Sequence, residues 1–327
     1  MFRGKVESFS RIRRGVKSNG KAVGSHLTME RDRKKGRGKG ERTSILIFTL
    51  LLLLIAAATA SGREAERVTD ARGKAFSPGP YRRIVSLAPN LTEILFSIGA
   101  GDRVVGVTSF CTIPPDAGRI ARVGGIVDPD IEKIIALSPD LVVASKNGTG
   151  KSAVETLDSL GLSCFVFDVD SAGKVLEAME TLSLLTGMPP EAGKVIESFR
   201  SRLLRLRKST PREKVKGLLL LSVTPPIGAG GKTFIDEVLA LAGVDNLLKE
   251  ETAAYPRLSA EKVVSLRPDY IFITRGMGER EVARFRKTME ALSGNTRIVE
   301  VDADLFTRPG PRVLKAVEVL RKVIGRR

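Results

Sequence analysis

Two glycine–lysine pairs in the sequence have residue types that could hold a phosphate group. Residues 150–152 read Gly-Lys-Ser and residues 231–233 read Gly-Lys-Thr, each after a stretch typical of a strand. A phosphate-binding loop has the pattern G-x-x-x-x-G-K-[ST], in which backbone amides surround the phosphates. Ser145 and Pro226 stand where the first glycine of that pattern belongs. The sequence therefore argues against nucleotide hydrolysis and indicates loops that follow strands.

Histidine and cysteine are almost absent, which excludes several common kinds of active site. The sole histidine is His26, and the only cysteines are Cys111 and Cys164. A domain without His26 cannot build a Ser-His-Asp or Cys-His pair, or a zinc site with histidine ligands. An oxidising compartment would permit a disulfide between the two cysteines, and buried free thiols are equally compatible with their strand-like surroundings. The chemistry that remains is that of carboxylates, lysine and tyrosine.

The net charge of +17 is concentrated at the start of the 327-residue chain. Residues 1–60 contain 14 Lys and Arg against 4 Asp and Glu, and the remainder contains 40 against 33. A mixed surface with a mild basic bias is not a focused nucleic-acid footprint. We therefore expect no nucleic-acid partner.

The basic start leads into an uncharged apolar segment. Residues 1–43 form a basic extension, and residues 44–60 have the length of the apolar core of a signal peptide. Ala58-Thr-Ala60 is a small-x-small pattern that a signal peptidase could cut, although an uncleaved membrane anchor has a similar length. Met29 is an alternative start that leaves the translation of residues 1–28 open. We expect an exported, periplasmic protein, anchored to the membrane if the segment stays uncleaved.

Past residue 60, apolar runs typical of strands alternate with helical patterns. Residues 61–81 are polar and unperiodic, which predicts a linker. Asn90 has a residue type that favours a helix cap, and it precedes the helical spacing of apolar residues over 91–98. Alternation of this kind predicts parallel sheets covered by helices, in an N-terminal α/β lobe over 82–170 and a C-terminal lobe over 211–327. Between them, residues 171–210 predict a helical connector that is interrupted at residues 186–190.

A repeat relates the two predicted lobes. Residues 131–145 (IEKIIALSPDLVVAS) align without a gap with residues 260–274 (AEKVVSLRPDYIFIT), and residues 93–102 echo residues 237–245. Two similar α/β lobes enclose a cleft, and ligands of open parallel sheets bind beyond the carboxyl ends of the strands. The architecture therefore favours a protein that holds a ligand.

Several blocks of sequence between residues 82 and 325 resemble one protein family, and they occur in the same order as in that family. They include RRIVSLAPNLTEILFSIGAGDRVVGVTSF, the two copies of the repeat, PPIGAGGKTFIDEVLALAGVDNLL and RPGPRVLKAVEVL. These blocks are similar to the substrate-binding proteins of ABC importers for vitamin B12, ferric siderophores and haem. The resemblance implies two Rossmann-like lobes joined by a long connecting helix, with a ligand cleft between the lobes.

The resemblance also implies a function in binding and transport, without catalysis. Such a protein binds a metal-chelate ligand, either a corrinoid or a ferric siderophore, and delivers it to the ABC importer permease with its ATPase. It is expected to be a monomer and to need no cofactor, no metal and no catalytic residue of its own. The alternative is an exported α/β enzyme that acts on a corrinoid or a metal chelate.

Strand-end positions and the resemblance together predict the ligand contacts. Two aromatic rings, Tyr255 and Phe306, could stack on a macrocycle, and three arginines could meet negative charge on a ligand. Tyr255 is also the residue best placed to bind the iron of a haem. The predicted ligand contacts are Pro89, Asn90, Phe110, Ser145, Lys146, Asn147, Pro226, Ile227, Gly228, Tyr255, Arg257, Arg275, Phe306 and Arg308.

The repeat supplies the predicted contacts with the permease. The resemblance implies that an acidic residue on each lobe docks against basic residues of the permease. Glu132 and Glu261 occupy the same place in the two copies of the repeat. Charge pairing at two such points would fix orientation more than it adds affinity. The alternative is that each is an exposed first-turn acid favoured by the helix dipole.

Overall fold

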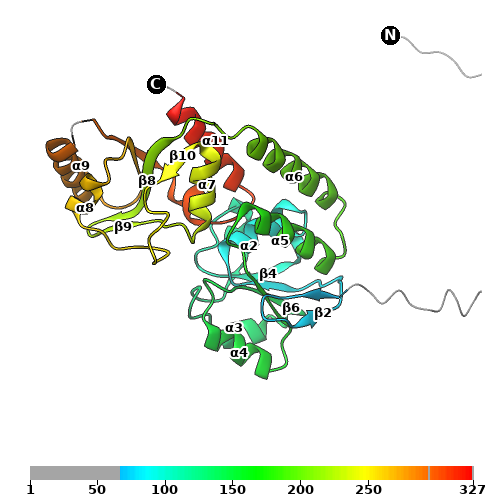
Figure 1. Ribbon diagram of the computed structural model, residues 1–327. Coiled ribbons are helices and arrows are strands. Elements are labelled where there is room, and N and C mark those ends of the chain that lie inside the picture. The colour runs from blue at the N-terminus through cyan, green and yellow to red at the C-terminus, as the bar shows by residue number, and fades with distance from the viewer. Residues whose placement is uncertain (1–66, 294, 326–327) are drawn as a thin grey trace, which may run out of the picture. The chain divides into compact units, whose positions relative to one another are not determined.

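The computed structural model describes residues 67–293 and 295–325, and Arg63–Arg327 form one compact unit. The basic extension and the predicted signal segment lie outside the described residues. The predicted α/β class is confirmed, because the described residues contain two five-stranded sheets with helices between successive strands. Figure 1 shows the sheets as separate layers that the chain visits one after the other.

The N-terminal lobe is built on an entirely parallel sheet. Its strand order is β5-β4-β3-β6-β7. The strands are β3 (Ile84–Ser86), β4 (Val104–Val107), β5 (Ala121–Arg122), β6 (Leu141–Ser145) and β7 (Cys164–Phe167). The helices of this lobe are α2 (Pro89–Ser97), α3 (Ile131–Ala136) and α4 (Lys151–Ser159), with 3₁₀ turns at Gly101–Arg103 and Pro115–Arg119. Alternate strand residues point to opposite faces, so α2 covers one face of the sheet while α3 and α4 cover the other.

The C-terminal lobe repeats this design with an added antiparallel strand. Its order is β10-β8-β11-β12, and β9 pairs antiparallel with β8. The strands are β8 (Val215–Val223), β9 (Pro226–Gly228), β10 (Val244–Asn246), β11 (Tyr270–Thr274) and β12 (Arg297–Val301). The helices are α7 (Phe234–Ala242), α8 (Ala260–Ser265), α9 (Glu279–Ser293), α10 (Ala303–Thr307) and α11 (Val313–Ile324). Helices α7 and α11 pack on one face of the sheet, and α8 and α9 on the other.

The connector consists of two helices, α5 (Ala172–Leu185) and α6 (Ala192–Lys208). They are separated at the Gly-Met-Pro-Pro stretch, where Gly187 and Met188 have positive φ angles of 69° and 54°. Buried residues of α5 and α6 belong to the same hydrophobic cluster as α2, α7 and α11. The connector is therefore part of a core that runs through both lobes.

The two copies of the repeat fold alike, and several of their identical residues have a structural reason. Asp140 accepts hydrogen bonds from the backbone amides of Arg82 and Arg83, at 2.7 and 2.9 Å, and Asp269 accepts one from the amide of Lys216 at 2.7 Å. Each aspartate thus ties its own strand to the start of the neighbouring strand. The two prolines that precede them are buried.

The turn before these aspartates also has the same backbone in both copies. Ser138 and Arg267, at equivalent positions, have positive φ angles of 45° and 49°. A positive φ is uncommon outside glycine, so its presence at both places marks a shared turn.

Two local expectations are corrected. Helix α2 begins at Pro89 with Ala88 as the capping position, so Asn90 lies within the helix and is buried instead of capping it. Proline at the first helical position loses no hydrogen bond, which explains the earlier start.

The predicted linker contains a hairpin of β1 (Val68–Thr69) and β2 (Ala75–Phe76). The buried carboxylate of Asp70 accepts hydrogen bonds from the amides of Arg72, Lys74 and Val166. Because Val166 belongs to β7, these bonds fix the hairpin against the first sheet, and residues 68–76 are part of the fold.

Cys111 and Cys164 are both free and buried. Burial raises the pKa of the Cys164 thiol to about 12, so this thiol stays neutral. Within residues 67–293 and 295–325, no helix is long and apolar enough to cross a membrane. The same part of the chain contains no group of three or more His, Cys, Asp or Glu residues placed to hold a metal ion.

Candidate functional site

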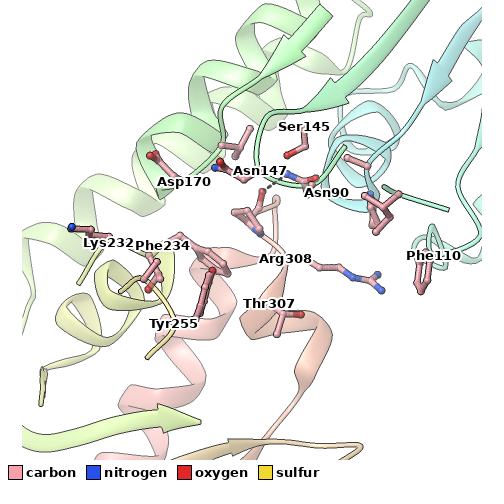
Figure 2. A pocket seen from close by; sticks show the side chains of 18 residues that line it. Asn90, Phe110, Ser145, Asn147, Asp170, Lys232, Phe234, Tyr255, Thr307 and Arg308 are labelled. Atoms are coloured by element: carbon pink, nitrogen blue, oxygen red, sulfur yellow. Dashed lines mark hydrogen bonds between the residues drawn. The ribbon is translucent and has the colours of Figure 1, made fainter. Parts of the chain in front are cut away.

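A cavity of about 620 Å³ lies where the strand ends of the two lobes face each other. Figure 2 shows its walls, with side chains from the N-terminal lobe on one side and from the C-terminal lobe on the other. The cavity is lined by Ala88, Pro89, Asn90, Phe110, Ile126, Ser145, Asn147, Gly148, Val169, Asp170, Lys232, Thr233, Phe234, Ala254, Tyr255, Thr307, Arg308 and Pro309.

The wall from the N-terminal lobe follows the rule that ligand sites form at the carboxyl ends of parallel strands. Ser145 ends β6, and its amide donates a hydrogen bond to the Thr149 hydroxyl at 3.1 Å, which closes the loop that follows. Asp168, just after β7, holds this loop from outside. It accepts hydrogen bonds from Lys146 Nζ at 2.6 Å and from Asn147 Nδ2 at 3.3 Å. Lys146 is therefore occupied by Asp168 at the rim and does not line the cavity.

The wall from the C-terminal lobe includes the second Gly-Lys-Thr stretch. The Thr233 side chain caps α7 by accepting a hydrogen bond from the Asp236 amide at 3.3 Å, and Lys232 Nζ donates to the Thr252 carbonyl at 3.2 Å. The first stretch has a similar role, because Gly150 directly precedes α4. Both stretches thus lead into helices.

Tyr255 presents an aromatic surface to the cavity. Its side chain is 49% exposed, whereas Phe234 beside it is buried. Partial burial raises the pKa of the Tyr255 phenol above its usual value, so the neutral phenol persists at physiological pH. A neutral phenol can stack on a ligand or donate a hydrogen bond, and it is a poor ligand for a metal ion.

Arg308, one of the two cations that line the cavity, is compensated within the protein. Arg308 Nη2 lies 2.9 Å from Asp304, and Arg308 Nη1 lies 4.0 Å from Glu93. Arg312 makes two hydrogen bonds to the same Glu93 carboxylate. Two carboxylates thus balance two guanidinium groups at or next to the cavity wall. Lys232 also lines the cavity, and among the described residues it has no carboxylate partner, so the wall offers one uncompensated cation.

The cavity brings together half of the ligand contacts predicted from the sequence. Those that line it are Pro89, Asn90, Phe110, Ser145, Asn147, Tyr255 and Arg308.

The other predicted contacts lie elsewhere. Pro226, Ile227 and Gly228 form β9, which pairs with β8, and Arg257 bridges to Ile227. Arg275 lines a separate hollow of about 280 Å³ at the ends of β8 and β11. Phe306 has no exposed surface, because α10 turns its ring into the core, so stacking on a ligand is left to Tyr255.

Sequence reasoning missed several lining residues. Asp170 follows β7 and could have been found from the strand-end rule that located Ser145. Lys232 and Phe234 were set aside with the failed phosphate loop, although the same helix start places them in the cavity. Thr307 and Pro309 flank the predicted Arg308.

Glu132 and Glu261 lie away from the cavity, each exposed in the first turn of a short helix. A hydrogen bond from the Ser259 hydroxyl, together with one from its own backbone amide, lowers the pKa of Glu261. Neither glutamate has an ion-pair partner among the described residues. The lysines beside them do have such partners, Asp130 for Lys133 and Glu251 for Lys262.

Known proteins are similar to the chain over its two lobes. The vitamin B12-binding protein of Vibrio campbellii is 31% identical over 246 residues, which cover 74% of this chain and 89% of that protein. An uncharacterized ABC transporter substrate-binding lipoprotein of Bacillus subtilis, YvrC, is 32% identical over 253 residues, covering 74% and 80%. These relatives are named as binding proteins, so the predicted class is confirmed and the alternative of an exported enzyme is not supported.

Solved structures of similar proteins support the same assignment as the sequence relatives. The periplasmic vitamin B12 binding protein BtuF of Vibrio cholerae superimposes with a TM-score of 0.68 at 30% identity, covering 75% of this chain and 97% of that one. The periplasmic haem-binding protein HutB of Vibrio cholerae gives a TM-score of 0.65 at 22% identity, which shows a common fold. The family model described as periplasmic binding protein matches residues 84–299. With that match spanning both lobes and the cavity between them, the chain belongs to the periplasmic binding protein family.

Proposed function

We propose that this protein binds a corrinoid in the cavity between its lobes and delivers it to the permease of an ABC importer. The relatives named as vitamin B12-binding proteins support a corrinoid. The observation that carries the proposal is the small net charge of the cavity wall, where Arg308 is compensated by Asp304 and Glu93 and the other charged lining residues are one carboxylate, Asp170, and one lysine, Lys232. A corrinoid presents an apolar macrocycle edged with uncharged amides, which suits compensated charges, amide side chains and the ring of Tyr255.

Multiply anionic ferric siderophores and haem fit less well. A ligand with several negative charges needs several unpaired cations. Among the described residues, the lining offers Lys232 alone, because Arg308 is paired with Asp304 and Lys146 at the rim is held by Asp168. These features favour the corrinoid among the metal chelates that the family binds.

Calorimetric titration of the full chain tests the ligand. Cyanocobalamin and cobinamide are expected to bind, with haemin and a ferric tricatecholate much weaker. Tighter binding of the tricatecholate than of either corrinoid would contradict the reasoning from charge, and absence of binding to all four would refute the metal-chelate class.

We also propose that Glu132 and Glu261 dock the protein on the permease. The identical aspartates and prolines of the repeat have structural roles, whereas these two exposed carboxylates have no ion-pair partner in the described part of the chain. Two separated carboxylates of this kind suit basic residues on a membrane protein and fix the orientation of the complex. The protein is exported by its N-terminal segment and acts as a monomer in the periplasm.

Charge reversal tests the docking. Glu132→Lys combined with Glu261→Lys should leave the affinity for cyanocobalamin unchanged, because both residues lie away from the cavity, and should abolish corrinoid uptake by cells. The matched control reverses Glu155 and Glu290, two exposed glutamates on α4 and α9, and should preserve uptake. Normal uptake by the first variant would remove these two residues from the interface.

A further inference from the structure

An ion pair between a buried carboxylate, that of Glu93, and the partly exposed guanidinium of Arg312 joins the two lobes next to the cavity. Glu93 lies on α2 of the N-terminal lobe, and its side chain is only 4% exposed. Arg312 precedes α11 of the C-terminal lobe, and it donates from Nε to Glu93 Oε2 at 2.8 Å and from Nη2 to Glu93 Oε1 at 3.0 Å. Two parallel hydrogen bonds between planar groups fix direction as well as distance. The pair therefore constrains how α2 and α11 are placed relative to each other.

Residues that line the cavity adjoin this pair on both sides. Asn90, one turn before Glu93, donates from Nδ2 to the Pro309 carbonyl at 3.2 Å. Arg308, four residues before Arg312 in the segment between α10 and α11, lies 4.0 Å from Glu93 and lines the cavity next to Pro309. Figure 2 shows Asn90 and Arg308 on the segments of the two lobes that face each other, and its dashed line marks the bond from Asn90 to the Pro309 carbonyl. A shift of the ion pair would move both walls.

The second echo in the sequence adds a contact of the same kind. Glu237 on α7 corresponds to Glu93 in the alignment of 93–102 with 237–245, and Gly99 and Gly243, which follow the two helices, have φ angles of 80° and 86°. Glu237 accepts a hydrogen bond from the Ala172 amide at the start of α5, at 2.6 Å. Helix α5 packs against α2 of the N-terminal lobe. Glu237 of the C-terminal lobe therefore contacts the N-terminal side through α5, and its position in the sequence echo is equivalent to that of Glu93.

Stability alone is a poor explanation for the Glu93–Arg312 pair. Burying the Glu93 carboxylate costs free energy that its attraction to Arg312 offsets only in part, and apolar replacements of buried ionic groups are often as stable. The pair is better explained by the geometry that its two parallel hydrogen bonds impose. That geometry sets the separation of Asn90 and Arg308 in the cavity.

We propose that Glu93 and Arg312 are positioning residues for ligand capture, which hold the two walls of the cavity at the spacing that the ligand requires. Arg308 is held by Asp304 at 2.9 Å and lies 4.0 Å from the same Glu93 carboxylate, so Glu93 also contributes to the charge balance of this wall. The inference rests on the proposed function only for the identity of the ligand. The spacing itself is a property of the ligand-free protein.

The test measures spacing and affinity separately in the full chain. Spin labels on Glu155→Cys and Glu290→Cys report the distance between the lobes by pulsed electron resonance, because the two native thiols are buried. The double variant Glu93→Gln, Arg312→Gln removes both charges and leaves no unpaired ion. We expect a broader distance distribution without ligand and cyanocobalamin affinity weaker by on the order of tenfold, a usual size for coupling between sites.

A matched control and a second variant complete the test. Arg202 and Glu318 form an exposed pair at 2.8 Å between α6 and α11, and their replacement by Gln should change neither readout. If the double variant does not fold, Arg312→Lys keeps the charge and loses the two-point geometry. An unchanged distance distribution overturns the proposal whatever the affinity. If the native protein does not bind cyanocobalamin, the corrinoid proposal fails, and the distance measurement still decides this inference.

Discussion

Replacement of Tyr255 by alanine should weaken corrinoid binding by a factor that follows from its exposure. An aromatic side chain buries about 150–250 Å² when fully covered, and 49% of the Tyr255 side chain is exposed in the cavity without ligand. Covering that half removes about 100 Å² from water, which corresponds to about 2.5 kcal/mol at ~25 cal/mol per Å². Because each 1.4 kcal/mol is about tenfold in affinity, the dissociation constant should rise about 60-fold.

Two further variants distinguish the contribution of the Tyr255 ring to affinity from that of its hydroxyl and from general effects of surface substitutions. Tyr255→Phe keeps the ring and should bind cyanocobalamin within about threefold of the native protein, since one hydrogen bond has a small net contribution. Leu160→Ala is the matched control, because Leu160 is 53% exposed at the end of α4 and does not line the cavity. Calorimetry gives all three constants. A loss below about threefold in Tyr255→Ala would refute coverage of the ring, and a large loss in Tyr255→Phe would indicate that the phenol oxygen binds a metal.

Four other results are expected. Cys164, whose pKa is about 12 through burial, should resist thiol reagents at pH 8 in the native protein and react fully in guanidinium. Since the unfolded thiol ionises near 9, the free energy of unfolding should also fall as pH rises from 9 towards 12 in denaturant titrations. Asp70→Asn should destabilise the protein by about 3 kcal/mol in such titrations, because the buried carboxylate accepts several hydrogen bonds, and should leave ligand affinity unchanged. Lys146→Ala should change corrinoid affinity by less than about threefold, because the ammonium group is held by Asp168, whereas a larger loss would place Lys146 on the ligand.

Much of the fold follows from patterns in the sequence. The repeat, with its proline and aspartate after each helix, located two equivalent helix–strand units, and Asp140 and Asp269 show why those residues recur. Helix α9 was missed because residues 279–293 are strongly charged and their apolar positions are sparse. The hairpin at residues 68–76 was missed because its stability comes from Asp70 and Val166, which lie far apart in the sequence.

The cavity was harder to predict than the fold. The strand-end rule gives the correct edge of each sheet, as Ser145 and Asn147 show. It cannot say which side chains turn towards the ligand, because that depends on packing between distant segments. Phe306 and Tyr255 both looked suitable for stacking, and only the docking of α10 on the core separates the buried ring from the exposed one.

The core that runs through α5 and α6 into both lobes makes the duplicated halves of this chain interdependent. Each half has its own sheet and its own copy of the repeat, and in that sense resembles a complete domain. Yet each would expose a broad apolar surface if separated, because buried residues of α2, α7 and α11 share one cluster with the connector. Heating should therefore produce a single calorimetric transition, and neither half should fold when expressed alone. An ancestral protein of one lobe would have needed a second copy of itself to cover that surface, so a dimer is the simplest precursor of the present chain.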